Sequence, residues 1–157
     1  MTPRKEHLIS EENKVCMISY NSRGFSDIKV EFMKFLLSNS VTGNRVPILC
    51  NQENFMLREN AFKLRQALPD YQLLINPAVK KDLTSGRPSN GMFIAFPDNI
   101  KNYVTDVSPG FWRVQAVRIR FKSSSLLLIN SYFPLIPREQ VLIRLSCWRL
   151  LPSSSKS

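Results

Sequence analysis

The apolar and polar positions of this chain follow both helical and strand periods, which predicts a mixed fold. Apolar runs over 15–20 and 46–50 are short and end at polar residues, so each predicts a buried strand. Between them, a Ser22-Arg23-Gly24 turn precedes apolar residues at helical spacing, with Ser26 placed to cap the helix. The apolar face that this spacing predicts consists of Phe25, Ile28, Phe32, Phe35 and Leu36.

Strand patterns dominate the rest of the chain. The expected elements are a helix over 59–68, strands over 71–75, 91–96 and 112–121, a strand over 126–133, and a short basic amphipathic helix over 138–151. The last two strands are expected to form a hairpin, and a slip in alternation at Ala116-Val117 predicts a bulge. Two early βα units followed by consecutive strands predict an α/β sandwich in which helices cover stacked sheets.

Composition and charge narrow the class of partner. The 157 residues are 43% hydrophobic, enough for one domain with a core. Lys and Arg number 22 against 12 Asp and Glu, a net charge of +10 that suits a polyanion such as nucleic acid. The excess lies mainly in the last third, where Glu139 is the only acidic residue after Asp106. A solvated basic surface is the alternative for any single cation.

The cysteines and the first residues indicate an intracellular protein. Cys16, Cys50 and Cys147 show no metal-binding spacing and are odd in number, so we expect reduced thiols. Residues 1–13 form a polar leader without the apolar core of a signal peptide, and no run has the length of a membrane span.

Two polar residues at predicted strand ends are candidate metal ligands. Asn21 follows the first apolar run, and Glu53 follows the second after Asn51-Gln52. If the two strands are neighbours, an amide oxygen and a carboxylate meet at one sheet edge, and both are oxygen ligands that suit Mg²⁺. Asn21 could instead close a turn with its side chain, as asparagine often does.

Four segments resemble the endonuclease/exonuclease/phosphatase superfamily, whose fold is DNase I-like. They are Ile18-Ser19-Tyr20-Asn21-Ser22-Arg23-Gly24, Ile48-Leu49-Cys50-Asn51-Gln52-Glu53, Gly86-Arg87-Pro88-Ser89-Asn90-Gly91 and Ile129-Asn130-Ser131-Tyr132-Phe133-Pro134. Together they are most similar to the apurinic-type endonuclease domain of non-LTR retrotransposons. The resemblance runs from about Lys14 to Pro134 and covers the N-terminal half to two-thirds of that domain.

The resemblance implies a role for several residues. Glu53 would ligate Mg²⁺, Asn21 would support the metal site, and the Tyr132 hydroxyl would face the scissile phosphate as a catalytic group. A core role for Tyr132 is the alternative. Arg23 occupies a position where retrotransposon enzymes often carry arginine. Asn90 replaces a commoner glycine, and asparagine tolerates the left-handed backbone that such a position requires.

Nucleic-acid contacts are expected from four cations, Arg23, Arg87, Lys80 and Lys81. For Arg87 a structural turn is the alternative.

The catalytic set of the family is incomplete in these residues. An Asp-x-Asn after the strand over 126–133 and a later Asp-His pair are missing, and the only histidine, His7, lies in the leader. We therefore expect a truncated, inactive Mg²⁺-dependent DNA endonuclease, with a partial domain over 14–136 and a divergent basic tail over 137–157. A basic nucleic-acid-binding or interaction module, and a phosphatase of the same superfamily, are the alternatives.

Further expectations concern metal, partners and location. We expect Mg²⁺ binding to be weak or lost, no small-molecule cofactor, DNA as partner, and a nuclear location. An incomplete core would also expose apolar surface and favour self-association.

Overall fold

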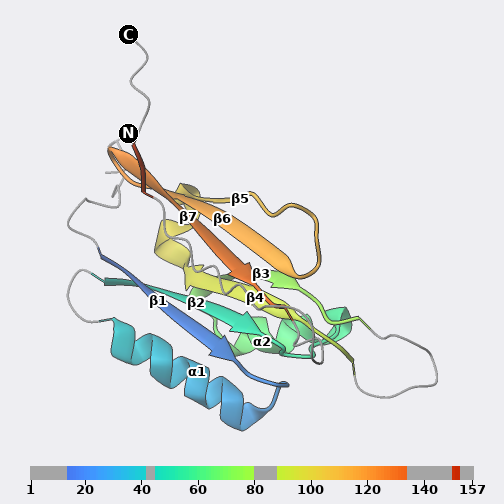
Figure 1. Ribbon diagram of the computed structural model, residues 1–157. Helices are drawn as coiled ribbons and strands as arrows, with labels where there is room; N and C mark the ends of the chain where they lie inside the picture. Colours follow the sequence, from blue (N-terminus) through green and yellow to red (C-terminus); the bar gives the residue numbers. More distant parts are fainter. Residues whose placement is uncertain (1–13, 42–44, 80–87, 134–149, 153–157) are drawn as a thin grey trace, which may run out of the picture.

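Two four-stranded sheets stack face to face, and two helices cover the outer face of one of them (Figure 1). This computed structural model describes residues 14–41, 45–79, 88–133 and 150–152. The elements are β1 (Lys14–Asn21), α1 (Asp27–Ser40), β2 (Arg45–Gln52), the 3-10 helix η1 (Arg58–Asn60), α2 (Ala61–Ala67), β3 (Tyr71–Asn76), β4 (Met92–Pro97), the 3-10 helix η2 (Asp98–Tyr103), β5 (Val104–Asp106), β6 (Val114–Arg120), β7 (Ser124–Ser131) and β8 (Leu150–Pro152). The expected mixed α/β class with stacked sheets is confirmed.

The two sheets differ in strand direction. The first has the order β1-β2-β4-β3, with β1 and β2 parallel and β4 antiparallel to both of its neighbours. The second has the order β5-β6-β7-β8 and is antiparallel throughout, and it contains the expected β6–β7 hairpin. The parallel β1–β2 pair brings Asn21 opposite Gln52, so the two strands end side by side.

Separate cores lie on the two faces of the first sheet. Met33, Leu37 and Leu64 of the helices pack on Leu49 and Phe93 on one face. On the other face, residues of the first sheet pack against the second sheet, and this core includes Ile48, Ile94, Val117, Ile119 and Leu128. The central strands β2 and β4 are buried on both faces, which explains their continuous apolar runs.

Helix α1 begins where the sequence predicts, but its buried face is the opposite one. The Ser26 Oγ accepts a hydrogen bond from the Lys29 N–H at 3.4 Å, which confirms the cap. The residues that pack on the sheet are Val30, Met33 and Leu37. Three residues of the predicted face are exposed instead, Ile28 at 83%, Phe32 at 44% and Phe35 at 59%. The helix is apolar on two opposite sides, so periodicity alone could not choose between them.

The bulge expected in β6 is absent. Pairing with β7 runs without interruption from Val114 opposite Ser131 to Arg120 opposite Ser125. The residues that face the core are Gln115, Val117 and Ile119, because side chains alternate along a strand. Gln115 is completely buried. Because this polar residue occupies a core position, the alternation of apolar and polar residues along the strand is interrupted in the sequence although the strand itself is regular.

Buried amide side chains join the two sheets. Asn130 of β7 accepts from Gln52 Nε2 of β2 at 2.6 Å. The Asn130 Nδ2 group donates, at 3.2 Å in each case, to the Asn51 and Phe93 carbonyl oxygens and to Gln115 Oε1. Gln115 Nε2 donates to the Leu74 carbonyl oxygen of β3 at 3.0 Å. The two sheets are therefore fixed to each other by direct hydrogen bonds as well as by apolar contact. We call Gln52, Gln115 and Asn130 the amide cluster.

The structure also tests what the sequence predicts for the cysteines and the tail. Cys16 and Cys50 are free thiols, and burial raises the pKa of Cys50 to about 12. In the tail, Leu150 and Leu151 belong to β8, so the expected helix is wrong at its last two residues. Residues 1–13, 137–149 and Cys147 lie outside the described residues. Within the described ranges, no helix is long and apolar enough to cross a membrane.

The apolar residues of α1 bear on self-association. Ile28, Phe32 and Phe35 lie on its outer face, and β1, which pairs only with β2 among the described strands, forms an edge of the first sheet. An open edge beside apolar surface favours association with another chain. Self-association stays a prediction, which sedimentation velocity at rising protein concentration would test.

We expect Asn130→Ala to lower the free energy of unfolding by about 2–4 kcal/mol, because it leaves buried amides of both sheets without partners. Ser131→Ala is the matched control, since Ser131 is exposed and adjacent on the same strand; its effect should stay within about 0.5 kcal/mol. Urea denaturation measures both. Equal effects of the two substitutions would contradict a structural role for the amide cluster.

Candidate functional site

The candidate site begins where β1 and β2 end side by side. The Asn21 Oδ1 accepts from the Arg23 N–H at 3.2 Å, so this side chain closes the turn that follows β1. The turn is held against the next strand, since the Ser22 N–H donates to the Gln52 carbonyl oxygen at 3.0 Å and the Gly24 N–H donates to the Glu53 carbonyl oxygen at 2.6 Å. Asn21 therefore has the structural role that the sequence left open.

Left-handed backbone is concentrated in these turns. Arg23, Glu53 and Phe55 have φ angles of 47°, 54° and 56°. A non-glycine residue rarely adopts this conformation, and it persists where surrounding contacts enforce it. The hydrogen bonds between the two turns are such contacts. Arg23 and Glu53 are consequently held in fixed positions at the strand ends.

The segment before β4 supports the Glu53 turn from the other side. The Phe55 N–H donates to the Asn90 carbonyl oxygen at 2.9 Å, and the Asn54 N–H donates to the Gly91 carbonyl oxygen at 3.1 Å. Asn90 has φ 71°, which confirms the left-handed conformation expected there. A Cβ atom on Gly91, where φ is 84°, would lie 2.3 Å from Asn54 Oδ1, so only glycine fits this contact. Lys80, Lys81 and Arg87 lie outside the described residues.

Tyr132 reaches the same place from the second sheet. Its hydroxyl donates a hydrogen bond to Glu53 Oε1, and its N–H donates to the Arg113 carbonyl oxygen at 3.1 Å. Burial, followed by the hydrogen bond to Glu53 and its negative charge, raises the pKa of Tyr132 to about 12. Positive charge from Arg113 and Arg23 acts in the opposite direction. The structure thus brings Tyr132, Glu53 and Arg23 together, with Asn21 at the adjoining strand end.

Arg113 and two aromatic neighbours are parts of this site that the sequence analysis did not identify. The Arg113 guanidinium lies 4.1 Å from the centre of the Trp112 ring, and the Phe111 and Trp112 ring centres are 5.8 Å apart. The pairing register of the β6–β7 hairpin is the signal that identifies them. Val114 pairs with Ser131, so the residue before β6 lies beside the residue after β7, which is Tyr132.

Two buried N–H groups, one on Arg113 and one on the residue after Glu53, lack hydrogen-bond partners among the described residues. The donor atoms are Arg113 Nε and Asn54 Nδ2. Asn21 Oδ1 and Glu53 Oε1 already accept hydrogen bonds from other groups. Unpartnered N–H donors together with positive charge suit an anionic ligand.

The donor set offers little to Mg²⁺. In proteins this ion is usually held by one or two carboxylates together with substrate phosphates and waters. Glu53 is the one carboxylate among the predicted site residues, and it is engaged by Tyr132. No group of three or more His, Cys, Asp or Glu side chains in the described part of the chain could hold a metal ion. The positive charge of Arg113 and Arg23 that acts on Tyr132 opposes a cation here, and Mg²⁺ binding by Glu53 and Asn21 stays a prediction.

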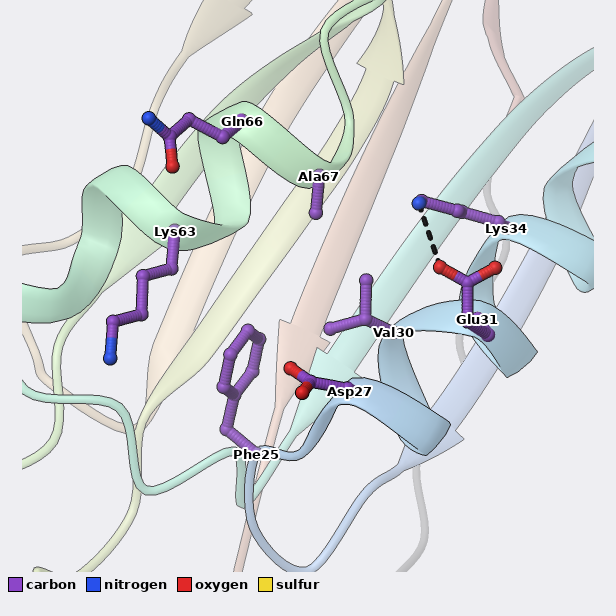
Figure 2. A pocket seen from close by; sticks show the side chains of 8 residues that line it. All are labelled: Phe25, Asp27, Val30, Glu31, Lys34, Lys63, Gln66 and Ala67. Carbon is purple, nitrogen blue, oxygen red and sulfur yellow. Dashed lines mark hydrogen bonds and ion pairs between the residues drawn. The ribbon is translucent and has the colours of Figure 1, made fainter.

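A separate shallow groove of about 350 Å³ lies between α1 and α2 (Figure 2). Its lining carries both charges, with Asp27 and Glu31 on one helix and Lys63 on the other, and Lys34 forms an ion pair with Glu31 at 2.8 Å. None of the predicted site residues lines it. The groove is therefore distinct from the site at the strand ends.

No protein-family model and no curated protein sequence matches this chain. The resemblance to the endonuclease/exonuclease/phosphatase superfamily therefore stays a prediction, and so do the site roles that it implies.

We expect a high-pH titration to show one phenol with a pKa near 12. Since the folded pKa lies above the ordinary value of 10, stability is retained below pH 10 and falls as the pH rises towards 12. Glu53→Gln removes the negative charge and should lower the pKa of Tyr132. Ultraviolet absorbance follows phenolate formation, with Tyr132→Phe as the control that lacks this component. An unchanged titration in Glu53→Gln would show that the carboxylate does not act on Tyr132.

Proposed function

We propose that this chain is a catalytically inactive derivative of a DNA endonuclease of the endonuclease/exonuclease/phosphatase type, and that it binds nucleic-acid phosphates at the strand ends. The observation that carries this proposal is that Arg23 and Arg113, from opposite halves of the chain, both lie near Tyr132. Arg23 belongs to the turn that is hydrogen-bonded to Glu53, the partner of the Tyr132 hydroxyl, and the Arg113 carbonyl oxygen accepts the Tyr132 N–H. Both positive charges act on the Tyr132 phenol. Arginine is the side chain best suited to phosphate, because its planar donors match the phosphate oxygens.

The charge of the site and of the whole chain support an anionic partner. The net charge of +10 gives long-range attraction to a polyanion, and the two arginines supply a local point of contact. The guanidinium of the half-buried Arg113 is held against the Trp112 ring before a ligand arrives, which reduces the entropy lost on binding.

The ionisation of the site argues against hydrolysis. A general base for water activation needs a pKa near the working pH, but Tyr132, with a pKa of about 12, stays protonated at neutral pH. The Glu53 carboxylate accepts a hydrogen bond from the Tyr132 hydroxyl, and the described residues contain no group of three or more His, Cys, Asp or Glu side chains that could hold a metal ion. Phosphate binding without bond cleavage is what remains for these groups.

We expect the purified chain not to nick supercoiled plasmid DNA in Mg²⁺, because none of the described site residues is placed to activate water. Agarose electrophoresis separates nicked from supercoiled plasmid. Glu53→Ala, prepared identically, measures background from host nucleases, and the two proteins should give equal traces. Nicking by the wild type that disappears in Glu53→Ala would overturn the assignment as inactive.

We expect Arg113→Gln and Arg23→Gln each to weaken binding to DNA and to reduce the slope of log affinity against log salt by about 0.9, the value for one phosphate contact. The matched control is Arg120→Gln, which removes an exposed arginine at the opposite end of β6. Fluorescence anisotropy of labelled DNA at several salt concentrations gives these slopes. Equal losses for Arg113→Gln and Arg120→Gln would mean that only diffuse net charge binds DNA.

A further inference from the structure

The connection between β5 and β6 displays two neighbouring aromatic rings to solvent. Phe111 is 48% exposed and Trp112 is 38% exposed, and their planes are tilted by 37°. Neighbouring exposed apolar side chains form a patch, and such patches can mark a binding surface. We call this pair the aromatic shelf.

The chain on either side of the aromatic shelf is anchored. The Val114 N–H donates to the Phe111 carbonyl oxygen at 2.9 Å and closes a tight turn. Towards β5, the Val107 N–H donates to the Ala116 carbonyl oxygen at 2.9 Å, and Ser108 Oγ accepts from the Ala116 N–H at 3.1 Å. The two rings are thus presented on a connection tied to β6 at both ends.

The aromatic shelf continues directly into the phosphate-binding residues. Arg113 stacks at 4.1 Å from the Trp112 ring centre, and its carbonyl oxygen accepts the N–H of Tyr132. One continuous surface therefore offers aromatic rings at one end and arginine charge at the other. A nucleotide has the same two parts, a flat base and a phosphate, linked by a short sugar.

We propose that the aromatic shelf stacks an unpaired base of a single-stranded nucleic acid whose phosphate is bound at Arg113. This inference rests on the proposed phosphate binding and adds the form of the nucleic acid. In a duplex, both faces of an internal base are covered by its neighbours, so the shelf has nothing to stack on unless a base is extruded. Stacking on aromatic side chains tolerates every base, so we expect little sequence preference.

The test compares three probes, a short single-stranded DNA of mixed sequence, the duplex of the same length, and inorganic polyphosphate, which has phosphates but no bases. Wild-type protein should bind the single strand more tightly than the duplex. Phe111→Ser and Trp112→Ser should each weaken single-strand binding by roughly five- to a hundredfold, the range for loss of one base stack. Polyphosphate affinity should change less than about twofold in Phe111→Ser, because polyphosphate has no base to stack. Trp112→Ser also removes the ring that supports Arg113, so Phe111→Ser is the variant that separates base stacking from phosphate binding.

Two controls separate stacking from folding defects. Phe62→Ser removes a similarly exposed ring from α2, where it is 53% exposed, and should leave all three affinities unchanged. Trp112→Phe keeps an aromatic ring and should retain most of the single-strand affinity. Two results would overturn base stacking on the aromatic shelf. One is an equal loss of single-strand and polyphosphate affinity in Phe111→Ser. The other is equal affinity of the wild-type protein for the single strand and the duplex.

The same experiment distinguishes failure of this inference from failure of the proposed function. If Arg113→Gln leaves polyphosphate binding unchanged, phosphate binding at this site is wrong. If Arg113→Gln weakens polyphosphate binding while Phe111→Ser and Trp112→Ser leave single-strand binding unchanged, the site binds phosphate and only the aromatic shelf is wrong.

Discussion

The hydrogen bonds of Asn130 are the constraint on which the rest of this structure depends. Asn130 is 2% exposed, and its side chain bonds to β2, β4 and β6 at once. Buried amides are costly unless every polar atom finds a partner, so the amide cluster permits one stacking register of the two sheets. Gln52 immediately precedes Glu53, and Asn130 lies two residues before Tyr132. The cluster therefore also determines where the Glu53 carboxylate meets the Tyr132 hydroxyl.

Local signals in the sequence predicted much of this fold. The Ser26 cap, the buried strands at 46–50 and 91–96 and the β6–β7 hairpin depend on residues close together in the chain, and all are present. The features that were missed depend on distant contacts. The face of α1 was chosen wrongly because both sides are apolar, and Gln115 looked like a surface residue because its partners, Asn130 and the Leu74 carbonyl oxygen, lie on other strands.

In the candidate site too, some residues are predicted from local motifs and others depend on contacts between distant parts of the chain. Asn21 and Glu53 are predicted from their positions at strand ends, and Tyr132 from the family resemblance; the structure brings Glu53 and Tyr132 into contact. Arg113 was counted only as one of many cations, since its position beside Tyr132 depends on the pairing of β6 with β7. This difference alters the chemistry that the site supports. Positive charge beside a phenol with a raised pKa is the basis of the phosphate binding that we propose.

The measurement that tests the amide cluster most directly is a double-mutant cycle on Gln52 and Asn130, with unfolding free energies from urea denaturation of the wild type, Gln52→Ala, Asn130→Ala and the double variant. The two side chains are 2.6 Å apart and join different sheets, so their effects should be non-additive. The account predicts a coupling energy of about 1–3 kcal/mol. Additive effects, within about 0.5 kcal/mol, would contradict it, because the sheets would then be held together by apolar packing alone.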